Sequence, residues 1–476
     1  MSSGRKNTIL LKTQNVKQTL KLMRHLMIII FLFFYTRPSV AQLPIPTPEK
    51  IQSTQGTFHL KDKYPTVYVV DKSAPYLELF QKEVLHTTSI RLSNQKQKAT
   101  ISFISDSSLP SESYKINITQ KHIEIHAKDK GGFIYAVQTL RQWVSMEQGH
   151  PTFACADITD SPRLNWRCFM LDSGRQFQKV PTIKKYIDMA SLLKMNRFHW
   201  HLTEGLGWRI EIKRYPELTR TGAFVGKGTE QQGYYSQEDI REIVKYAVDR
   251  NITIVPEIDM PGHATAANKA YPEYSGGGTE EHPEFTFNVG KEETYTYLTN
   301  ILKEIAALFP SPYLHIGGDE VAYGIKAWET DPHVQALLKR EGLQTVKEAE
   351  RYFMHRMTDV VNSLGKTLVG WDELLDLNVK QDNTIIMWWR HDKPDYLRKS
   401  LTKGYSTIMC PRKPLYFDFV QYKDHKWGRI WDGFCPIEDV YAFPDKWFAE
   451  WGVSASDLSH VKGIQANTWT ELMHTK

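Results

Sequence analysis

Eight apolar, strand-like runs alternate with amphipathic stretches from about residue 160 onward, and this alternation limits the possible folds more than any other feature. Strands that alternate with helices form a parallel sheet, because a parallel connection needs a crossover. Eight such units predict an α/β fold, a (β/α)8 TIM barrel. The runs are Trp166–Asp172, Arg197–Glu204, Ile252–Asp259, Tyr313–Glu320, Thr367–Glu373, Thr384–Arg390, Ser406–Cys410 and Gly463–Glu471.

The stretches between these runs have the periodicity of helices with one buried face. Ser236 is a typical N-cap in front of one of them. Only five residues follow Glu471, so we expect the barrel to lack its last helix. The predicted helices are Thr182–Met195, Gln237–Arg250, Glu292–Leu308 and Val346–Leu364.

A smaller α+β domain is predicted before the barrel, which gives a division into residues 42–150 and 151–476. A helix-like pattern from Phe133 to Val144 follows several β-rich segments. No cluster of catalytic residue types occurs there, so we interpret it as a support domain, with carbohydrate binding as a weaker option. Its predicted strands are Thr66–Val70, Thr100–Ile104, Tyr114–Ile118 and His122–His126.

Residues 1–41 have the pattern of a secretory signal peptide. A basic stretch precedes an apolar core from Leu26 to Tyr35, and Ser39-Val40-Ala41 offers a small-residue cleavage site. The alternative is a membrane anchor, but the apolar core is about half of the ~20 residues that span a bilayer. We therefore expect export to the periplasm or the extracellular space, with no stable membrane span after cleavage.

The formal charge of +6 belongs to this leader, which carries seven basic and no acidic residues. The rest of the chain has 53 basic and 54 acidic residues, so its net charge is −1. This balance gives no indication of nucleic-acid binding. The four cysteines have no metal-binding spacing, and Cys168 and Cys410 lie in apolar runs that favour buried free thiols.

Polar residues end seven of the eight predicted strands. Barrel active sites are built at the C-terminal ends of the strands, so these residues are candidate site residues. The strand ends are Asp172, His199-Trp-His-Leu-Thr-Glu204, Glu257-Ile-Asp259, Asp319-Glu320, Trp371-Asp-Glu373, Trp388-Trp-Arg390 and Trp469-Thr-Glu471.

The pair Asp319 and Glu320 follows two glycines at the end of a short apolar run. Gly317 and Gly318 allow the backbone to bend and allow another group to approach closely. Both carboxylates could then reach one pocket. The simpler interpretation is that they begin a helix, since acidic residues favour a helix N-terminus.

The chain resembles the β-N-acetylhexosaminidases of glycoside hydrolase family 20, of the bacterial exported type, from about residue 42 to 476. The stretch His315-Ile-Gly-Gly-Asp-Glu-Val321 is the most specific match. The others are Asp160-Ser-Pro-Arg163, Met170-Leu-Asp172, Phe198-His-Trp-His-Leu202, Gly207-Trp-Arg-Ile-Glu211, Pro256-Glu-Ile-Asp-Met-Pro-Gly-His263, Gly370-Trp-Asp-Glu373 and Trp469-Thr-Glu471.

The resemblance implies an exo-acting glycosidase that removes terminal β-linked GlcNAc or GalNAc from a glycan, without a metal or other cofactor. In this family the substrate's own acetamido oxygen attacks the anomeric carbon. Glu320 is implied as the general acid and then the base. Asp319 is implied to orient the acetamido N–H and to stabilise the positive charge, and Tyr416 to bind the acetamido oxygen.

The resemblance also implies a set of sugar-binding residues. Arg167 is expected to hold ring hydroxyls deep in the pocket, and Asp418 and Glu471 to bind the outer hydroxyls. Flat aromatic rings pack well on sugar faces. The residues expected to wall the site are Trp371, Trp389 and Trp469.

His263 is expected to support Glu320 through a relay with an acidic residue. The family usually has Thr-Asp-Asp-Gln where this chain has Thr203-Glu-Gly-Leu206, so Glu204 is the expected partner, one methylene longer. Two other functions stay open. His199, His201, His263 and Asp319 could hold zinc in an amidohydrolase on the same barrel, or the chain could bind sugar without turnover.

Overall fold

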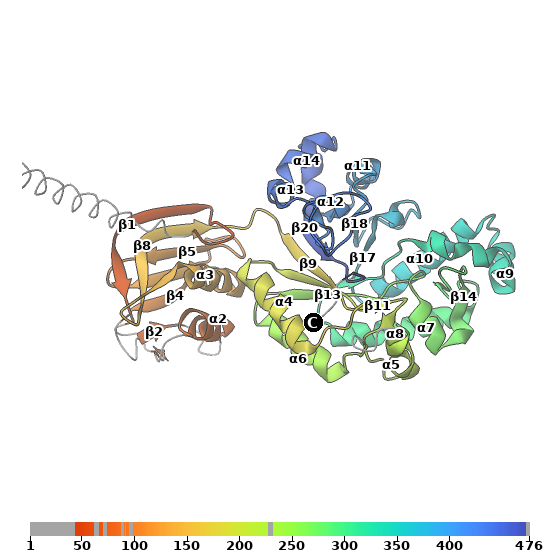
Figure 1. Cartoon of the computed structure of the whole chain (residues 1–476), viewed down its shortest axis with the longest axis horizontal. Coiled ribbons are helices and arrows are strands. Elements are labelled where there is room, and N and C mark those ends of the chain that lie inside the picture. The colour runs from red at the N-terminus through yellow and green to blue at the C-terminus, as the bar shows by residue number, and fades with distance from the viewer. Residues whose placement is uncertain are drawn as a thin grey trace, which may run out of the picture.

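The computed structural model describes residues 43–60, 66–69, 74–86, 90, 92–94, 99–226 and 232–472. The predicted signal peptide lies outside these residues. None of the described helices has the length and apolarity needed to cross a bilayer. Two domains lie side by side, the smaller one in orange on the left of Figure 1 and the barrel on the right.

The N-terminal domain is an eight-stranded mixed sheet with helices on one face. Alternate residues of the central strands are buried, as in Ile123–Ala127, because one sheet face packs against α3 (Lys130–Trp143). Two short helical segments are α2 (Pro75–Leu79) and η1 (Phe80–Val84). The strand order is β1 (Lys50–His59), β8 (His150–Asp160), β5 (Tyr114–Ile118), β6 (Ile123–Ala127), β4 (Ile101–Ser105), β2 (Thr66–Tyr68) and β3 (Ser93–Asn94), with β7 (Val144–Glu147) beside β8.

The boundary predicted at residue 150 is wrong by one strand. β8 pairs with β1 and β5 of the first sheet, so this domain continues to Asp160. β7 and β8 form a hairpin in which Glu147 pairs with His150. Gln148 and Gly149 both have positive φ, the combination that a two-residue hairpin turn with the right twist requires.

The two domains are joined by buried polar contacts as well as by the chain. Gln138 of α3 donates from Nε2 to Ser191 Oγ of α4 (Val180–Leu192) at 3.1 Å. Lys194 Nζ lies 2.7 Å from the carboxylate of Asp160, and its side chain is 8% exposed. A buried cation without a partner is costly, so this ion pair favours one arrangement of the domains.

The predicted TIM barrel is confirmed, and all eight predicted strands are present. Each observed strand begins within two residues of its predicted start, and all except the strand that ends at Asp172 end before their predicted end. The closed order is β10 (Arg197–His201), β13 (Thr253–Glu257), β16 (Tyr313–His315), β17 (Thr367–Trp371), β18 (Thr384–Trp388), β19 (Ser406–Met409), β20 (Val461–Thr468) and β9 (Trp166–Asp172), with every pair parallel.

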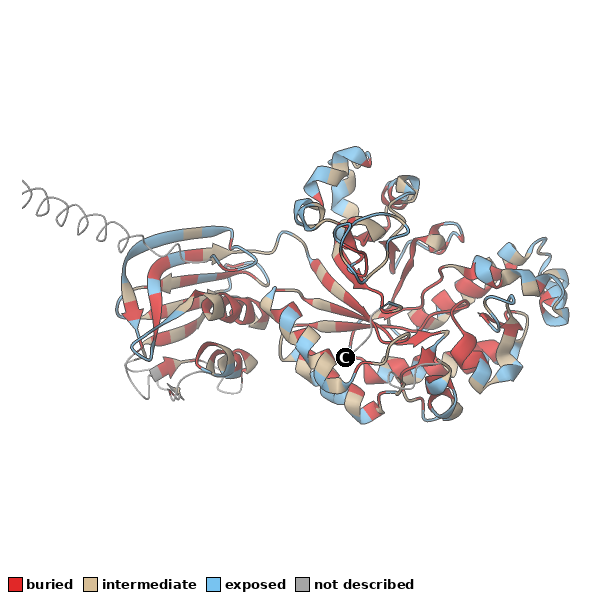
Figure 2. Ribbon diagram, viewed as in Figure 1, coloured by how far each residue is buried: buried red, intermediate tan, exposed pale blue. Residues whose placement is uncertain are grey.

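Alternate strand residues face the barrel interior and the surrounding helices. In β9, Cys168 and Met170 belong to the interior cluster, whereas Leu171 packs in the outer cluster with Phe198 and Leu314. Figure 2 shows buried residues along the strands and exposed residues on the outer faces of the helices. All four cysteines are buried and free.

The predicted helices are also present, with capping that explains their starts. Ser236 accepts from the backbone N–H of Asp239, and Asp239 bonds back to the N-cap, forming a capping box. Thr345 and Glu348 do the same for α10. The helices are α4, α5 (Glu217–Arg220), α6 (Gln237–Val248), α7 (Thr265–Ala270), α8 (Glu292–Leu308), α9 (Pro332–Glu341), α10 (Val346–Ser363), α11 (Pro394–Thr402), α12 (Arg412–Leu415), α13 (Ile437–Ala442) and α14 (Asp445–Glu450).

Short strands and 3-10 turns occupy the connections between the barrel strands and helices. β11 (Thr203–Glu204) pairs with β12 (Gly207–Trp208), and β14 (Ser275–Gly277) pairs with β15 (Thr286–Phe287). The 3-10 turns are η2 (Gly222–Phe224), η4 (Pro272–Tyr274), η5 (Val321–Tyr323), η6 (Ile325–Glu329), η7 (Asp372–Leu375) and η8 (Asp457–His460).

Candidate active site

A pocket of about 400 Å³ opens at the C-terminal ends of the barrel strands. Seven of the predicted site residues line it, contributed by the C-terminal ends of five different strands and the loops that follow them. This is the location that the barrel fold predicts for a site. The lining residues are Arg175, Asp319, Glu320, Tyr323, Trp371, Trp389, Arg412, Tyr416, Arg429, Trp431, Trp469 and Glu471.

The backbone before the acidic pair turns through the two glycines, as predicted. Gly317 and Gly318 have φ of +67° and +94°. A Cβ on Gly317 would lie 1.7 Å from Asp259 Oδ1. The group that approaches the Gly317 backbone closely is therefore the buried carboxylate of Asp259. Burial and the charge of Asp319 raise the pKa of Asp259 well above its ordinary value.

Glu320 does not act as a helix cap. It precedes η5 with φ of +52°, and its side chain makes no capping hydrogen bond. A left-handed conformation at a residue other than glycine costs about 1 to 3 kcal/mol and persists where the surroundings impose it, often at functional sites. Here it directs the side chain of Glu320, which is 32% exposed, to the pocket beside Asp319, which is 12% exposed.

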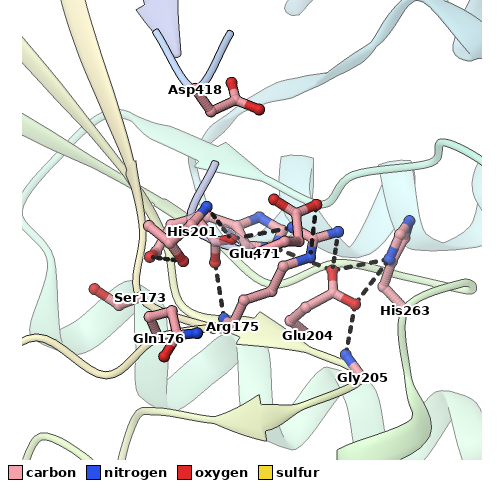
Figure 3. A network of polar contacts seen from close by, with 12 residues as sticks. Ser173, Arg175, Gln176, His201, Glu204, Gly205, His263, Asp418 and Glu471 are labelled. Carbon is pink, nitrogen blue, oxygen red and sulfur yellow. Dashed lines mark hydrogen bonds and ion pairs between the residues drawn. The ribbon is translucent and has the colours of Figure 1, made fainter. Parts of the chain in front are cut away.

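His263 connects this acidic pair to Glu204. Its Nε2 lies 3.5 Å from Asp319 Oδ2 and 3.4 Å from Glu320 Oε2. Its Nδ1 lies 2.8 Å from Glu204 Oε2 on the other side. The predicted relay from Glu204 through His263 to Glu320 is therefore present as a chain of contacts, and Figure 3 shows its Glu204 end.

The relay is charged at neutral pH. Burial alone would lower the pKa of His263, but the carboxylates of Glu204, Asp259 and Asp319 raise it well above the ordinary value. Burial alone would raise the pKa of Glu204, but Arg175 and His263 hold it well below the usual range. Glu204 and His263 thus form a buried ion pair beside the acidic residues of the pocket.

The longer side chain of Glu204 reaches three partners at once. Besides His263, its Oε2 lies 3.1 Å from Arg175 Nη2 and 3.4 Å from His201 Nε2. His201 in turn contacts the buried Glu257 through Nδ1, at 2.5 Å. Glu204 therefore links the pocket to the barrel interior, and the replacement of the family's usual aspartate keeps the charge next to His263.

Replacing Glu204 with glutamine is expected to shift the alkaline limb of the kcat/KM profile to lower pH. The glutamine removes the first of the charges that raise the pKa of His263, and an opposite charge at this distance is worth about one to three pH units. Above that pKa, His263 loses a proton that it donates towards Asp319 and Glu320. Activity near pH 5 should be less affected. The measurement is kcat/KM from pH 4 to 10 for both proteins.

Glu204→Asp is the matched control, because it keeps the charge and should retain more of the alkaline limb. Identical alkaline limbs in the parent and in Glu204→Gln, with both proteins folded by thermal unfolding, would contradict this role for Glu204.

The aromatic residues predicted to wall the site are all in the pocket. Trp371 donates from Nε1 to Glu257 at 2.9 Å, and Trp389 donates from Nε1 to Glu373 at 3.1 Å. The Trp389 and Tyr416 rings lie parallel with centroids 6.4 Å apart. Burial raises the pKa of Tyr416 well above its usual range, so its hydroxyl stays protonated and is a hydrogen-bond donor.

The prediction that Arg167 enters the pocket is wrong. Arg167 is the second residue of β9, at the opposite end of the barrel, and its position faces outward. Its guanidinium pairs with Glu112 of the N-terminal domain at 2.8 Å and donates to the Lys194 carbonyl at 2.8 Å. It is part of the contact between the domains.

Arg175 lines the pocket, together with Arg412 and Arg429. It lies in the loop after β9, between Asp172 at 3.1 Å, Glu204 at 3.1 Å and Glu471 at 3.2 Å. Its guanidinium carbon is 5.0 Å from the centre of the Trp469 ring. Figure 3 shows Arg175 at the centre of this network. Arg175 follows the C-terminal end of a predicted strand, and this position in the sequence could have indicated that it is a site residue.

Asp418 lies behind the pocket wall rather than among its lining residues. Its side chain is 3% exposed, and burial raises its pKa to about 6. Arg429 pairs with both Asp418 and Glu471. Arg412, Arg429, Trp431 and Tyr323 also line the pocket, and no sequence pattern indicated them.

The residues of the zinc alternative are divided among different groups in the described part of the chain. His199 and His201 each group with Glu257 in the barrel interior, whereas His263 and Asp319 group with Asp259. Each group has ligand atoms within 4.8 Å of one another and could hold a cation. The four side chains do not form the single site that this alternative requires.

Comparison with known families gives two matches that divide the chain as the structure does. "Glycosyl hydrolase family 20, catalytic domain" matches residues 164–476. "Glycosyl hydrolase family 20, domain 2" matches residues 44–161.

Curated relatives are named beta-hexosaminidases. One from Porphyromonas gingivalis is 33% identical over 90% of this chain and 57% of its own length. One from Vibrio furnissii is 34% identical over 76% of this chain and 62% of its own length. The chain thus spans less than two thirds of these two relatives.

Solved structures are similar over most of the chain. A beta-N-acetylhexosaminidase from Bacteroides fragilis has a TM-score of 0.81 and 39% identity, covering 90% of this chain and 86% of its own. An exo beta-N-acetylglucosaminidase from Vibrio harveyi, in complex with N-acetylglucosamine, has a TM-score of 0.84 and 31% identity, covering 91% of this chain and 70% of its own.

Proposed function

Because the chain belongs to glycosyl hydrolase family 20, we propose that it is an exo-acting β-N-acetylhexosaminidase that hydrolyses terminal β-linked GlcNAc or GalNAc with retention of configuration. One observation carries the proposal: Asp319 and Glu320 lie side by side in a tryptophan-lined pocket, with His263 within 3.5 Å of both.

Two carboxylates side by side suit substrate-assisted catalysis. The acetamido oxygen of the sugar attacks the anomeric carbon while Glu320 protonates the leaving oxygen. The acetamido N–H donates to Asp319, whose charge stabilises the cyclic oxazolinium. The Tyr416 hydroxyl donates to the acetamido oxygen. Glu320 then takes a proton from water, which attacks the anomeric carbon from the opposite face and restores its configuration.

The other lining residues would hold the sugar. Trp371, Trp389 and Trp469 offer flat apolar faces. Arg175 takes the role first assigned to Arg167, since it lines the pocket between Glu204 and Glu471. Glu471, beside Arg175, and Asp418 behind it would accept from the hydroxyls farthest from the anomeric carbon. The leader-like sequence of residues 1–41 supports action on glycans outside the cytoplasm.

The test is turnover of 4-nitrophenyl β-N-acetylglucosaminide and its galacto analogue, followed by nitrophenol release. We expect clear turnover, with the β-anomer of the free sugar formed first by NMR. An N-trifluoroacetyl substrate should react much more slowly, because its acetamido oxygen is a poorer nucleophile. A thiazoline analogue of the cyclic intermediate should inhibit competitively.

Other outcomes separate the remaining functions. Turnover that is lost on EDTA treatment and restored by zinc would favour the metal-dependent reaction. Binding of N-acetylglucosamine by a folded protein without turnover would favour a sugar-binding protein. Turnover indifferent to the N-acyl group would contradict substrate assistance while leaving the hexosaminidase activity standing.

A further inference from the structure

A single arginine, Arg429, holds the two carboxylates assigned to the outer hydroxyls. Its Nε pairs with Asp418 and its Nη2 pairs with Glu471. The two carboxylates come from different segments of the chain, one from the loop after α12 and the other from the loop after β20. Arg429 and Glu471 both line the pocket, and the Arg429 side chain is 22% exposed, whereas Asp418 lies buried beside it.

The loop that carries Arg429 folds back on the segment of Asp418. The Arg429 backbone N–H donates to the Asp418 carbonyl at 2.7 Å, and Val420 donates to the Arg429 carbonyl at 3.1 Å. Gly428 has φ of +134°, and a Cβ there would lie 2.7 Å from the Asp418 carbonyl oxygen. Both the backbone hydrogen bonds of Arg429 and its side-chain ion pair therefore hold the guanidinium next to Asp418.

The positive charge of Arg429 stabilises the ionised forms of Asp418 and Glu471. The Asp418 side chain is almost fully buried at 3% exposure and that of Glu471 is half-buried at 31%, and like charges at such positions repel. Arg175 holds Glu471 from the other side at 3.2 Å, but no second cation is paired with Asp418 among the described residues. Without Arg429, Asp418 would be a buried charge with no partner, which favours its protonation or its displacement.

We propose that Arg429 is a positioning residue that sets the selectivity of the pocket for the outer hydroxyls, by fixing Asp418 and Glu471 as hydrogen-bond acceptors. The proposal rests on the proposed function. A planar guanidinium fixes two carboxylates at defined angles, which a flexible ammonium does not do. Each carboxylate keeps a free oxygen, since Asp418 Oδ1 and Glu471 Oε2 have no hydrogen-bond partner in the described structure. Both oxygens are buried, and buried acceptors without a partner are rare, so the proposal assigns the sugar hydroxyls as their donors.

The experiment compares Arg429→Met and Arg429→Lys with the parent on three substrates: the 4-nitrophenyl β-glycosides of GlcNAc, 4-deoxy-GlcNAc and 6-deoxy-GlcNAc. We expect Arg429→Met to lower kcat/KM for the GlcNAc substrate by about 10- to 100-fold, the value of one or two hydrogen bonds to charged groups. The loss should be much smaller on the deoxy substrate whose missing hydroxyl the carboxylates bind. Arg429→Lys should fall between the parent and Arg429→Met.

Arg163→Met is the matched control. Arg163 pairs with Asp445 on the surface, with exposures of 64% and 71%, and its loss should leave kcat/KM unchanged on all three substrates. Thermal unfolding of each variant shows whether it is folded. An equal loss on all three substrates in a folded Arg429→Met would overturn the proposal, because the arginine would then support the loop without setting selectivity.

Failure of the proposed function gives a different pattern. A parent that turns over none of the substrates contradicts the hexosaminidase, and calorimetric binding of free GlcNAc and its deoxy analogues then makes the same comparison. If the parent binds GlcNAc but Arg429→Met keeps the parent's preference for it over the deoxy sugars, Arg429 has no positioning role. If the parent binds none of them, both proposals fail.

Discussion

Exchanging Glu320 for glutamine is expected to lower kcat for 4-nitrophenyl β-N-acetylglucosaminide by at least about a hundredfold, the scale that general acid–base catalysis supplies. Nitrophenol leaves with little acid help, so the first step should lose less than the second. Hydrolysis of the cyclic intermediate needs a base for the attacking water, and glutamine is not one. Steady-state kinetics with a burst measurement separate the two steps.

Rescue by azide provides a second test of the role of Glu320. Azide attacks the intermediate without a base, so adding azide to Glu320→Gln should restore turnover and yield the β-glycosyl azide. Glu238→Gln is the control, because Glu238 is 71% exposed and pairs with Arg241 at the surface. A Glu320→Gln protein with parental kcat would remove Glu320 from the proposed mechanism.

Exchanging Asp319 for asparagine is expected to lower kcat/KM by about 10² to 10³, the range for losing one electrostatic contact made in the transition state. The amide keeps the shape of the carboxylate, and its oxygen still accepts from the acetamido N–H. It lacks the negative charge that stabilises the oxazolinium. Stability should not fall, since Asp319 is the first charge that raises the pKa of Asp259 and its removal relieves that repulsion.

The measurement pairs kinetics with thermal unfolding. Asp382→Asn serves as the control, because Asp382 is exposed at the other end of the barrel. Loss of activity together with a lowered melting temperature would show that Asp319 supports the fold, which is contrary to our expectation.

The barrel was predictable because hydrophobic periodicity is local. β9 and α8 have their predicted bounds or nearly so, since each is a continuous run with clear starts and ends. In the N-terminal domain, β1, β3, β7 and β8 were not predicted. The hairpin between β7 and β8 did have a signal in Gln148-Gly149, where glycine permits the positive φ that the turn needs.

The error at Arg167 has a physical explanation that the sequence contained. Five residues of extended strand separate it from Asp172, about 16 Å at the usual rise. Side chains alternate, so Arg167 faces outward with Leu171 while Cys168 and Met170 face inward. No sequence pattern predicted that Arg429 lies in the pocket, because strand periodicity does not determine the conformation of a long loop.

The closed order of the strands also bears on how the chain folds during synthesis. β9 leaves the ribosome first of the barrel strands, yet one of its two neighbours is β20, the last strand to emerge. Until then β9 has an unpaired edge, and such edges are prone to pairing with other chains. The N-terminal domain is complete by that time, and it contacts Arg167 at the start of β9 and Lys194 just after α4. The N-terminal domain, which contributes no residue to the pocket lining, would thus stabilise β9 until β20 is synthesised and closes the barrel.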